Sequence, residues 1–191
     1  MNTIILLASL LPLTLAFPPL TNDVNKLATC PFPNQTDTKF YTYNCDGTMQ
    51  IQVRSAAVYD RLSNKEIYPV NVTVPLLIKL KSVNNGVAIN SNKVDVELAQ
   101  YSSSWTDSNC KWHSIPTFGL LKNIDGCEFA NNCPLQSGDL DLLLPLDLSK
   151  YSKILKLLTG DKAYQLRILM KDGEDATKKI SCVVAQLKFS N

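Results

Sequence analysis

Apolar and polar residues alternate in short runs along much of this chain, and that pattern constrains its fold more than any other feature. In the run 71–81, apolar side chains recur on one face with a period of two, whereas Asn71, Thr73, Lys79 and Lys81 fall on the other face. This period is typical of a β-strand with one buried side. The same alternation recurs in the runs 49–54, 94–98, 166–171 and 183–189.

Turn-forming dipeptides separate several of these runs. Asp46-Gly47, Asn85-Gly86 and Asp172-Gly173 all favour tight turns. Short strands at this spacing, with no long helical period between them, predict an all-β fold built as a two-sheet antiparallel sandwich. Pro145 lacks a backbone N–H, so its strand is expected at a sheet edge or to carry a bulge.

The segment 149–160 departs from the alternation. It places apolar residues next to one another between lysines and ends in Gly160. This pattern favours a short helix ended by the glycine. A loop or strand edge at the mouth of the sandwich is the alternative.

Residues 1–16 form an apolar run that ends in small residues. The run is too short to span a bilayer and suits cleavage by signal peptidase, so it predicts a signal peptide. A buried N-terminal strand or helix is the alternative. The remainder, residues 17–191, has the length of a single domain.

The cysteines agree with export. An even number of cysteines in an oxidising compartment predicts three disulfides, and six are present: Cys30, Cys45, Cys110, Cys127, Cys133 and Cys182. Cys127 and Cys133 are the natural local pair, whereas spacing alone leaves the other pairings open. A zinc site is the rival interpretation, but the chain has no CxxC pair and its single histidine is His113. We therefore expect no metal.

Two sequons for N-glycosylation also fit an exported protein. They begin at Asn34 and Asn71. Asn71 falls on the polar face of its predicted strand, where a glycan would lie in solvent.

The sequence does not favour catalysis or nucleic-acid binding. The net charge is +2, and acidic and basic residues are interspersed, unlike the basic patches that contact phosphates. There is no GxSxG, HExxH or glycine-rich phosphate loop. His113 is the only imidazole base and falls in a predicted strand, where a structural role is expected. We expect neither an enzyme nor a cofactor.

Several segments are apolar on both faces. They are 74–78, 142–146 and 182–185. A well-filled core explains them. The alternative is that the sheets splay and leave an apolar chamber for an acyl chain or a sterol, since each buried CH₂ contributes ~0.8 kcal/mol. The pattern alone leaves both alternatives open.

The segment 125–136 resembles a known family. Asp125-Gly126-Cys127, five intervening residues and then Cys133-Pro134-Leu135-Gln136 are similar to the central hairpin of the ML (lipid-recognition) domain family. Its members include sterol carriers, a ganglioside activator and a lipid A co-receptor. Looser matches to the family occur elsewhere along the chain in the expected order, at 43–46, 71–74, 158–168 and 179–182.

The resemblance implies an immunoglobulin-like sandwich with a lipid between its sheets. It implies the disulfides Cys45–Cys182 and Cys127–Cys133, which leaves Cys30 with Cys110. The pocket residues that it suggests are Phe118, Leu144, Leu146, Tyr151 and Ile168.

The same resemblance suggests a membrane-contact loop, in which the apolar residues are Ile154, Leu155, Leu157 and Leu158. Placement of these residues in the core is the alternative. The implied function is binding and transfer of a sterol, phospholipid or glycolipid in the extracellular space or the lysosomal lumen. The implied partners are a membrane surface and a receptor or lipid-processing enzyme. A secreted immune co-receptor that presents lipid to a receptor is the alternative.

Overall fold

The computed structural model describes residues 30–104, 106–130, 132–146, 151–156, 158 and 160–190. The predicted signal peptide lies outside these residues.

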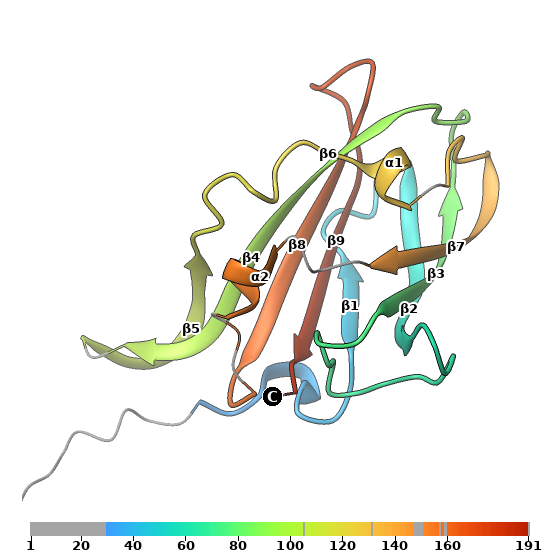
Figure 1. Ribbon diagram of the computed structural model, residues 1–191. Helices are drawn as coiled ribbons and strands as arrows, with labels where there is room; N and C mark the ends of the chain where they lie inside the picture. Colours follow the sequence, from blue (N-terminus) through green and yellow to red (C-terminus); the bar gives the residue numbers. More distant parts are fainter. Residues whose placement is uncertain are drawn as a thin grey trace, which may run out of the picture.

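Two antiparallel sheets face each other (Figure 1). The larger sheet has the strand order β1 (Tyr41–Asn44), β9 (Lys179–Lys188), β8 (Ala163–Asp172), β4 (Asn92–Ser104) and β5 (Asp107–Ile115), with β6 (Ile124–Asp125) also pairing with β4. The smaller sheet has the order β2 (Ile51–Asp60), β3 (Leu76–Asn84) and β7 (Gly138–Leu146). The predicted all-β, immunoglobulin-like sandwich of two antiparallel sheets is confirmed.

Short helices accompany the strands in the part of the chain that the structure describes. They are the 3₁₀ helix η1 (Pro33–Gln35), α1 (Gly126–Ala130) and α2 (Ser152–Leu155). The short helix expected within 149–160 is therefore present as α2, but it ends well before Gly160. Within the described residues, no helix has the length and apolar character to cross a membrane.

The predicted strand 71–81 needs a correction, because its ladder begins only at Leu76. Asn71 and Thr73 lie in a turn, where Asn71 Oδ1 accepts hydrogen bonds from the N–H and the hydroxyl of Thr73. Pro75, which follows, has no N–H to give to a strand ladder. The alternation in 71–75 therefore does not belong to the strand.

β7 is an edge strand, as Pro145 predicts. It pairs with β3 alone, and Pro145 lies opposite Leu77. A proline is tolerated on such an edge strand, where every second N–H faces away from the neighbouring strand.

The buried residues form two clusters at opposite ends of the sandwich. The hairpin-end cluster lies beside the Cys127–Cys133 loop and consists of Ile51, Ile89, Leu135, Leu140 and Ile180. The α2-end cluster consists of Val58, Val70, Leu76, Leu98, Ile154, Tyr164, Leu187 and Phe189. A space remains between the two clusters, and it is the candidate site.

Three disulfides join the pairs that the resemblance implies. Cys45–Cys182 links the end of β1 to β9, and Cys30–Cys110 links the N-terminal segment to β5. Cys127–Cys133 closes a loop around α1.

Candidate ligand-binding cavity

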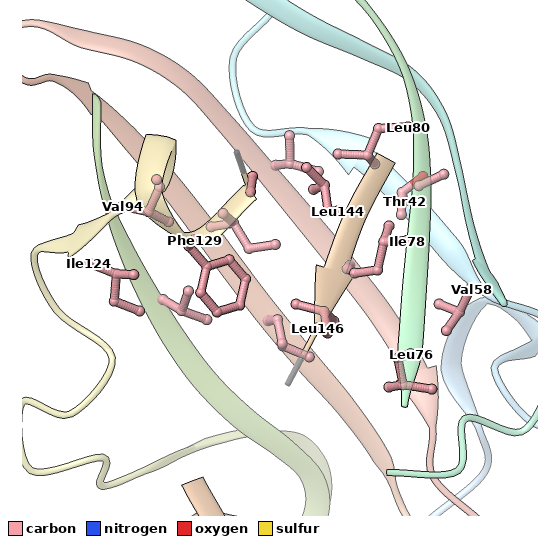
Figure 2. A pocket seen from close by; sticks show the side chains of 18 of the residues that line it. Thr42, Val58, Leu76, Ile78, Leu80, Val94, Ile124, Phe129, Leu144 and Leu146 are labelled. Carbon is pink, nitrogen blue, oxygen red and sulfur yellow. The ribbon is translucent and has the colours of Figure 1, made fainter. Parts of the chain in front are cut away.

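A cavity of about 320 Å³ lies between the two sheets. Its walls come from the inward faces of the strands, where every second residue points toward the opposite sheet. Figure 2 shows Ile78 and Leu80 of β3 on one side of this space, with Val94 and Ile124 on the other. The walls are almost entirely hydrocarbon, and no charged side chain is among the lining residues that the structure describes.

Each sheet contributes a continuous apolar series. The larger sheet contributes Val94, Val96 and Leu98 from β4, Leu166, Ile168 and Met170 from β8, and Val183, Ala185 and Leu187 from β9. The smaller sheet contributes Val53, Ala56 and Val58 from β2, Leu76, Ile78 and Leu80 from β3, and Leu142, Leu144 and Leu146 from β7. The alternation that predicts the strands thus also supplies the cavity walls.

One long edge of the sandwich, where β1 meets β2, is joined across the sheets. We call it the tied edge. The side chain of Asn44 accepts the N–H of Val53 at 2.9 Å and donates to the Val53 carbonyl at 2.8 Å. The Cys45–Cys182 disulfide lies directly beside this contact. The hydrogen bonds join the two sheets along this edge, and the disulfide fastens β1 to its neighbour β9 within the larger sheet.

The opposite edge, where β7 faces β4 and β5, is different. We call it the open edge. In the described part of the chain, no strand pairing joins β7 to the larger sheet. Instead, α1, α2 and the loop 116–123 lie along this edge (Figure 1). Their side chains Phe129, Ile154, Leu155 and Leu121 line the cavity.

The segment that resembles the ML-family hairpin begins with the two-residue strand β6, which is followed by the single helical turn α1. Asp125 Oδ1 accepts the N–H of Glu128 and so caps the N-terminus of α1. Lys93 Nζ lies 2.7 Å from Asp125 Oδ2, and this bond, together with the Glu128 N–H, lowers the pKa of Asp125. The carboxylate therefore stays ionised, and the cap persists, at neutral pH.

Close packing fixes α1 against β4. A Cβ on Gly126 would lie 1.9 Å from Oδ1 of Asn92, so a larger residue there would force the Asn92 side chain to move. The Nδ2 group of Asn92 lies 3.2 Å from Cys127 Sγ and 3.4 Å from Cys133 Sγ. The Asp-Gly-Cys motif thus sets the position of α1, and Figure 2 shows the Phe129 ring of α1 reaching into the space between the sheets.

Four of the five suggested pocket residues lie together at this site. Leu144, Leu146, Tyr151 and Ile168 all line the cavity. Phe118 does not, because it lies in the loop 116–123 with a positive φ and is 86% exposed.

The suggested membrane-contact residues face the same cavity where the structure describes them. Ile154 is buried, and Leu155 and Leu158 are half-buried among the lining residues. Leu157 lies outside the described residues.

Sequence reasoning missed Phe129. It lies inside the motif that carries the resemblance, but the resemblance depends on the cysteines of that motif and not on its aromatic residue. The signal that could have found it is the spacing of Asp125 and Glu128, which is typical of a helix N-terminus and turns the following aromatic toward the core.

The remaining candidates lie away from the cavity. Nε2 of His113, on β5, lies 3.1 Å from the Ser102 carbonyl oxygen. Asn34 is exposed and its side chain donates to Gln186 Oε1 at 2.6 Å. No group of three potential metal ligands occurs among the residues that the structure describes.

Similar folds occur among solved structures. A Niemann-Pick type C2 protein from Japanese carpenter ant matches with 12% identity and a TM-score of 0.43, covering 78% of this chain and 98% of that one. Chicken MD-1 complexed with lipid IVa matches with 12% identity and a TM-score of 0.34, covering 79% and 99%. No protein-family model matches the sequence, and no curated protein does.

Proposed function

We propose that this protein binds a lipid between its sheets and carries it from one membrane to another membrane, an enzyme or a receptor. The observation that supports this proposal is the apolar cavity. Its volume of about 320 Å³ is roughly twice that of an engineered apolar cavity that stays dry and holds benzene. A hydrocarbon group larger than one aromatic ring fits such a space.

The energetics of an empty cavity support a guest. The side chains that line this space lack packing partners on their inner side. A bound hydrocarbon chain restores the missing contacts and gains ~0.8 kcal/mol per buried CH₂.

The wall chemistry restricts the guest to its apolar part. No Lys, Arg, His, Asp or Glu is found among the lining residues described, so a charged headgroup inside would have no partner. A charged headgroup would remain outside, at the open edge. The same lack of acids, bases and thiols favours a carrier over an enzyme.

The three disulfides favour an oxidising compartment. We place the protein in the extracellular space or the lysosomal lumen, after removal of residues 1–16. Glycosylation at Asn34 and Asn71 belongs to the same proposal.

A delipidated sample tests this function through uptake of a fluorescent sterol, phospholipid and glycolipid. Leu146→Asp places a carboxylate in the apolar wall and should weaken uptake by at least about tenfold. Leu143→Asp is the matched control, because Leu143 lies on the same strand and is 58% exposed. Failure of the wild-type protein to take up any of the three lipids would rule the proposal out.

A second candidate is a secreted co-receptor that presents its lipid to a receptor. The exposed side chains Phe118 and Leu120 favour it, because the same loop places Leu121 in the cavity wall. Phe118 would then contact the lipid or its acceptor from outside the cavity. Capture of a receptor ectodomain only by lipid-loaded protein, with loss of capture in Phe118→Ser, would favour this role. Transfer between vesicles without such capture would favour the carrier.

A further inference from the structure

Two serines interrupt the apolar walls of the cavity. On β3, the inward series Leu76, Ile78 and Leu80 ends in Ser82, and on β9 the inward series begins at Ser181 before Val183, Ala185 and Leu187. Both serines line the cavity. A strand period of two would place an apolar residue at each position in a uniformly dry wall.

The two serines lie at the same end of the sandwich but on opposite sheets. Ser82 pairs with Leu140 of β7, which belongs to the hairpin-end cluster. Ser181 pairs with Met170 of β8, which packs against the same cluster. The serines therefore place two hydroxyl groups at the end of the cavity farthest from α2.

Both serines are buried residues whose hydroxyls lack a protein partner and border the cavity. Ser82 is 3% exposed and Ser181 is 4% exposed. Within the described residues, neither hydroxyl makes a hydrogen bond to the protein, and neither oxygen is among the fully enclosed unpartnered atoms, so both are accessible from the cavity. Hydroxyls inside a protein are normally hydrogen-bonded, so two unpaired ones that border one end of a cavity indicate a partner supplied by what fills it.

A third polar group lies at this end. Asn92 also lines the cavity and is 1% exposed, and its Oδ1 has no hydrogen-bond partner. Its Nδ2 group faces the sulfur atoms of Cys127 and Cys133. Asn92 makes this end more polar than the rest of the cavity.

We infer that the hairpin end of the cavity binds a hydroxyl group of the lipid, through the hydroxyls of Ser82 and Ser181; this inference rests on the proposed lipid binding. A serine hydroxyl both donates and accepts, and so does an alcohol. A carboxylate, phosphate or ammonium group would require a countercharge, and no charged residue is found in the described walls. The guest is thus a neutral lipid, or a neutral portion of one, that enters with an alcohol group first.

The test compares 1-hexadecanol with its methyl ether as competitors for an apolar fluorescent dye bound to delipidated protein. The two lipids share a chain and an oxygen, but only the alcohol can donate a hydrogen bond. We expect the wild-type protein to bind the alcohol about fivefold or more tightly than the ether, the effect of one net hydrogen bond. In Ser82→Ala/Ser181→Ala, the alcohol should lose that advantage while the ether keeps its affinity.

Ser55→Ala is the matched control, because Ser55 is an exposed serine on β2, and it should retain the preference for the alcohol. Thermal unfolding of each variant verifies that it is folded. Ser82→Ala alone should lose part of the preference for the alcohol over the ether. Equal affinity of the wild-type protein for alcohol and ether would overturn the inference and indicate that water, not the lipid, bonds the serines. An undiminished preference in the double variant would also overturn it. Absence of dye and lipid binding altogether would instead contradict the proposed function.

Discussion

The two long edges of this sandwich are built by opposite means. At the tied edge, the side chain of Asn44 joins the two sheets through hydrogen bonds to the Val53 backbone, and the Cys45–Cys182 disulfide fastens β1 to β9 within the larger sheet. At the open edge, β7 and the larger sheet are joined by no strand pairing in the described residues, and apolar side chains of short helices and a loop fill the gap. Covalent and hydrogen-bonded contacts have fixed geometry, whereas apolar contacts can be exchanged for contacts with a guest.

If the protein binds a lipid as proposed, the difference assigns stability to one edge and access for the lipid to the other. If the sheets were joined at both edges, a hydrocarbon guest could enter only if the protein unfolded. If they were joined at neither, the cavity would collapse, since protein interiors pack closely wherever they are free to do so. On the proposed function, the hydrogen-bonded edge would hold the sheets in place while the open edge gives the guest access.

The largest expected effect comes from removing the disulfide of the tied edge. Cys45 and Cys182 are 137 positions apart, whereas Cys127 and Cys133 are 6 apart. In the loop-entropy description, removing the first disulfide costs about 4–5 kcal/mol and removing the second about 2 kcal/mol. We expect Cys45→Ala/Cys182→Ala to unfold at much lower denaturant than Cys127→Ala/Cys133→Ala.

Among variants that remain folded, lipid uptake should be affected more by loss of Cys127–Cys133 than by loss of Cys45–Cys182. Loss of Cys127–Cys133 frees α1 and Phe129 at the open edge, so this variant should change more in lipid uptake than in stability. Urea unfolding and dye binding on the same samples provide both readings. Equal loss of stability in the two variants would contradict the division between the edges.

A smaller effect should follow from single side chains at the two edges. Asn44→Ala removes two hydrogen bonds at the tied edge and should cost about 1–2 kcal/mol in the free energy of unfolding, with lipid affinity nearly unchanged. Phe129→Ala removes a half-buried ring from the cavity wall. It should lower lipid affinity by about tenfold, since the guest loses the contacts of one aromatic side chain.

Titration of a fluorescent lipid against both variants, with unfolding curves as reference, measures the two effects. Ser55→Ala is a suitable neutral control on β2. An Asn44→Ala protein that loses affinity as strongly as Phe129→Ala would show that the tied edge also shapes the binding site.

The strands and their inward faces could be predicted because each strand carries its own alternation. Val94, Val96 and Leu98 alternate with charged neighbours, and they line the cavity as expected. The start of β3 could not be predicted from alternation, since Val72 and Val74 continue the same period through a turn. A turn and a strand can share a period, and only the hydrogen bonds distinguish them.

The cavity itself could not be predicted from the pattern. An inward Leu144 has the same neighbours in sequence whether it meets another side chain or a guest. The distance between the sheets decides this, and it depends on contacts such as Asn44 to Val53, far from Leu144 in sequence. The choice between Phe118 and Phe129 depends in the same way on a helix cap at Asp125.

The smallest expected effect is that of acid, and it should appear first at the open edge. The Lys171 ammonium and the Asn123 N–H lower the pKa of Asp95, which anchors the loop 116–123 to β4. Lys93 and the Glu128 N–H lower the pKa of Asp125, which caps α1. A carboxyl group with a lowered folded-state pKa stabilises the protein above its unfolded value of about 4, and that contribution is lost as pH falls through the folded value. The melting temperature should therefore hold between about pH 7 and 5 and decline below about pH 4.

Hydrogen exchange at about pH 3 should then show faster opening in 116–130 than in β1 and β2. The Asp95→Asn variant should show that faster opening of the loop already at neutral pH. A uniform rise in exchange across both edges would contradict the assignment of these carboxylates to the open edge.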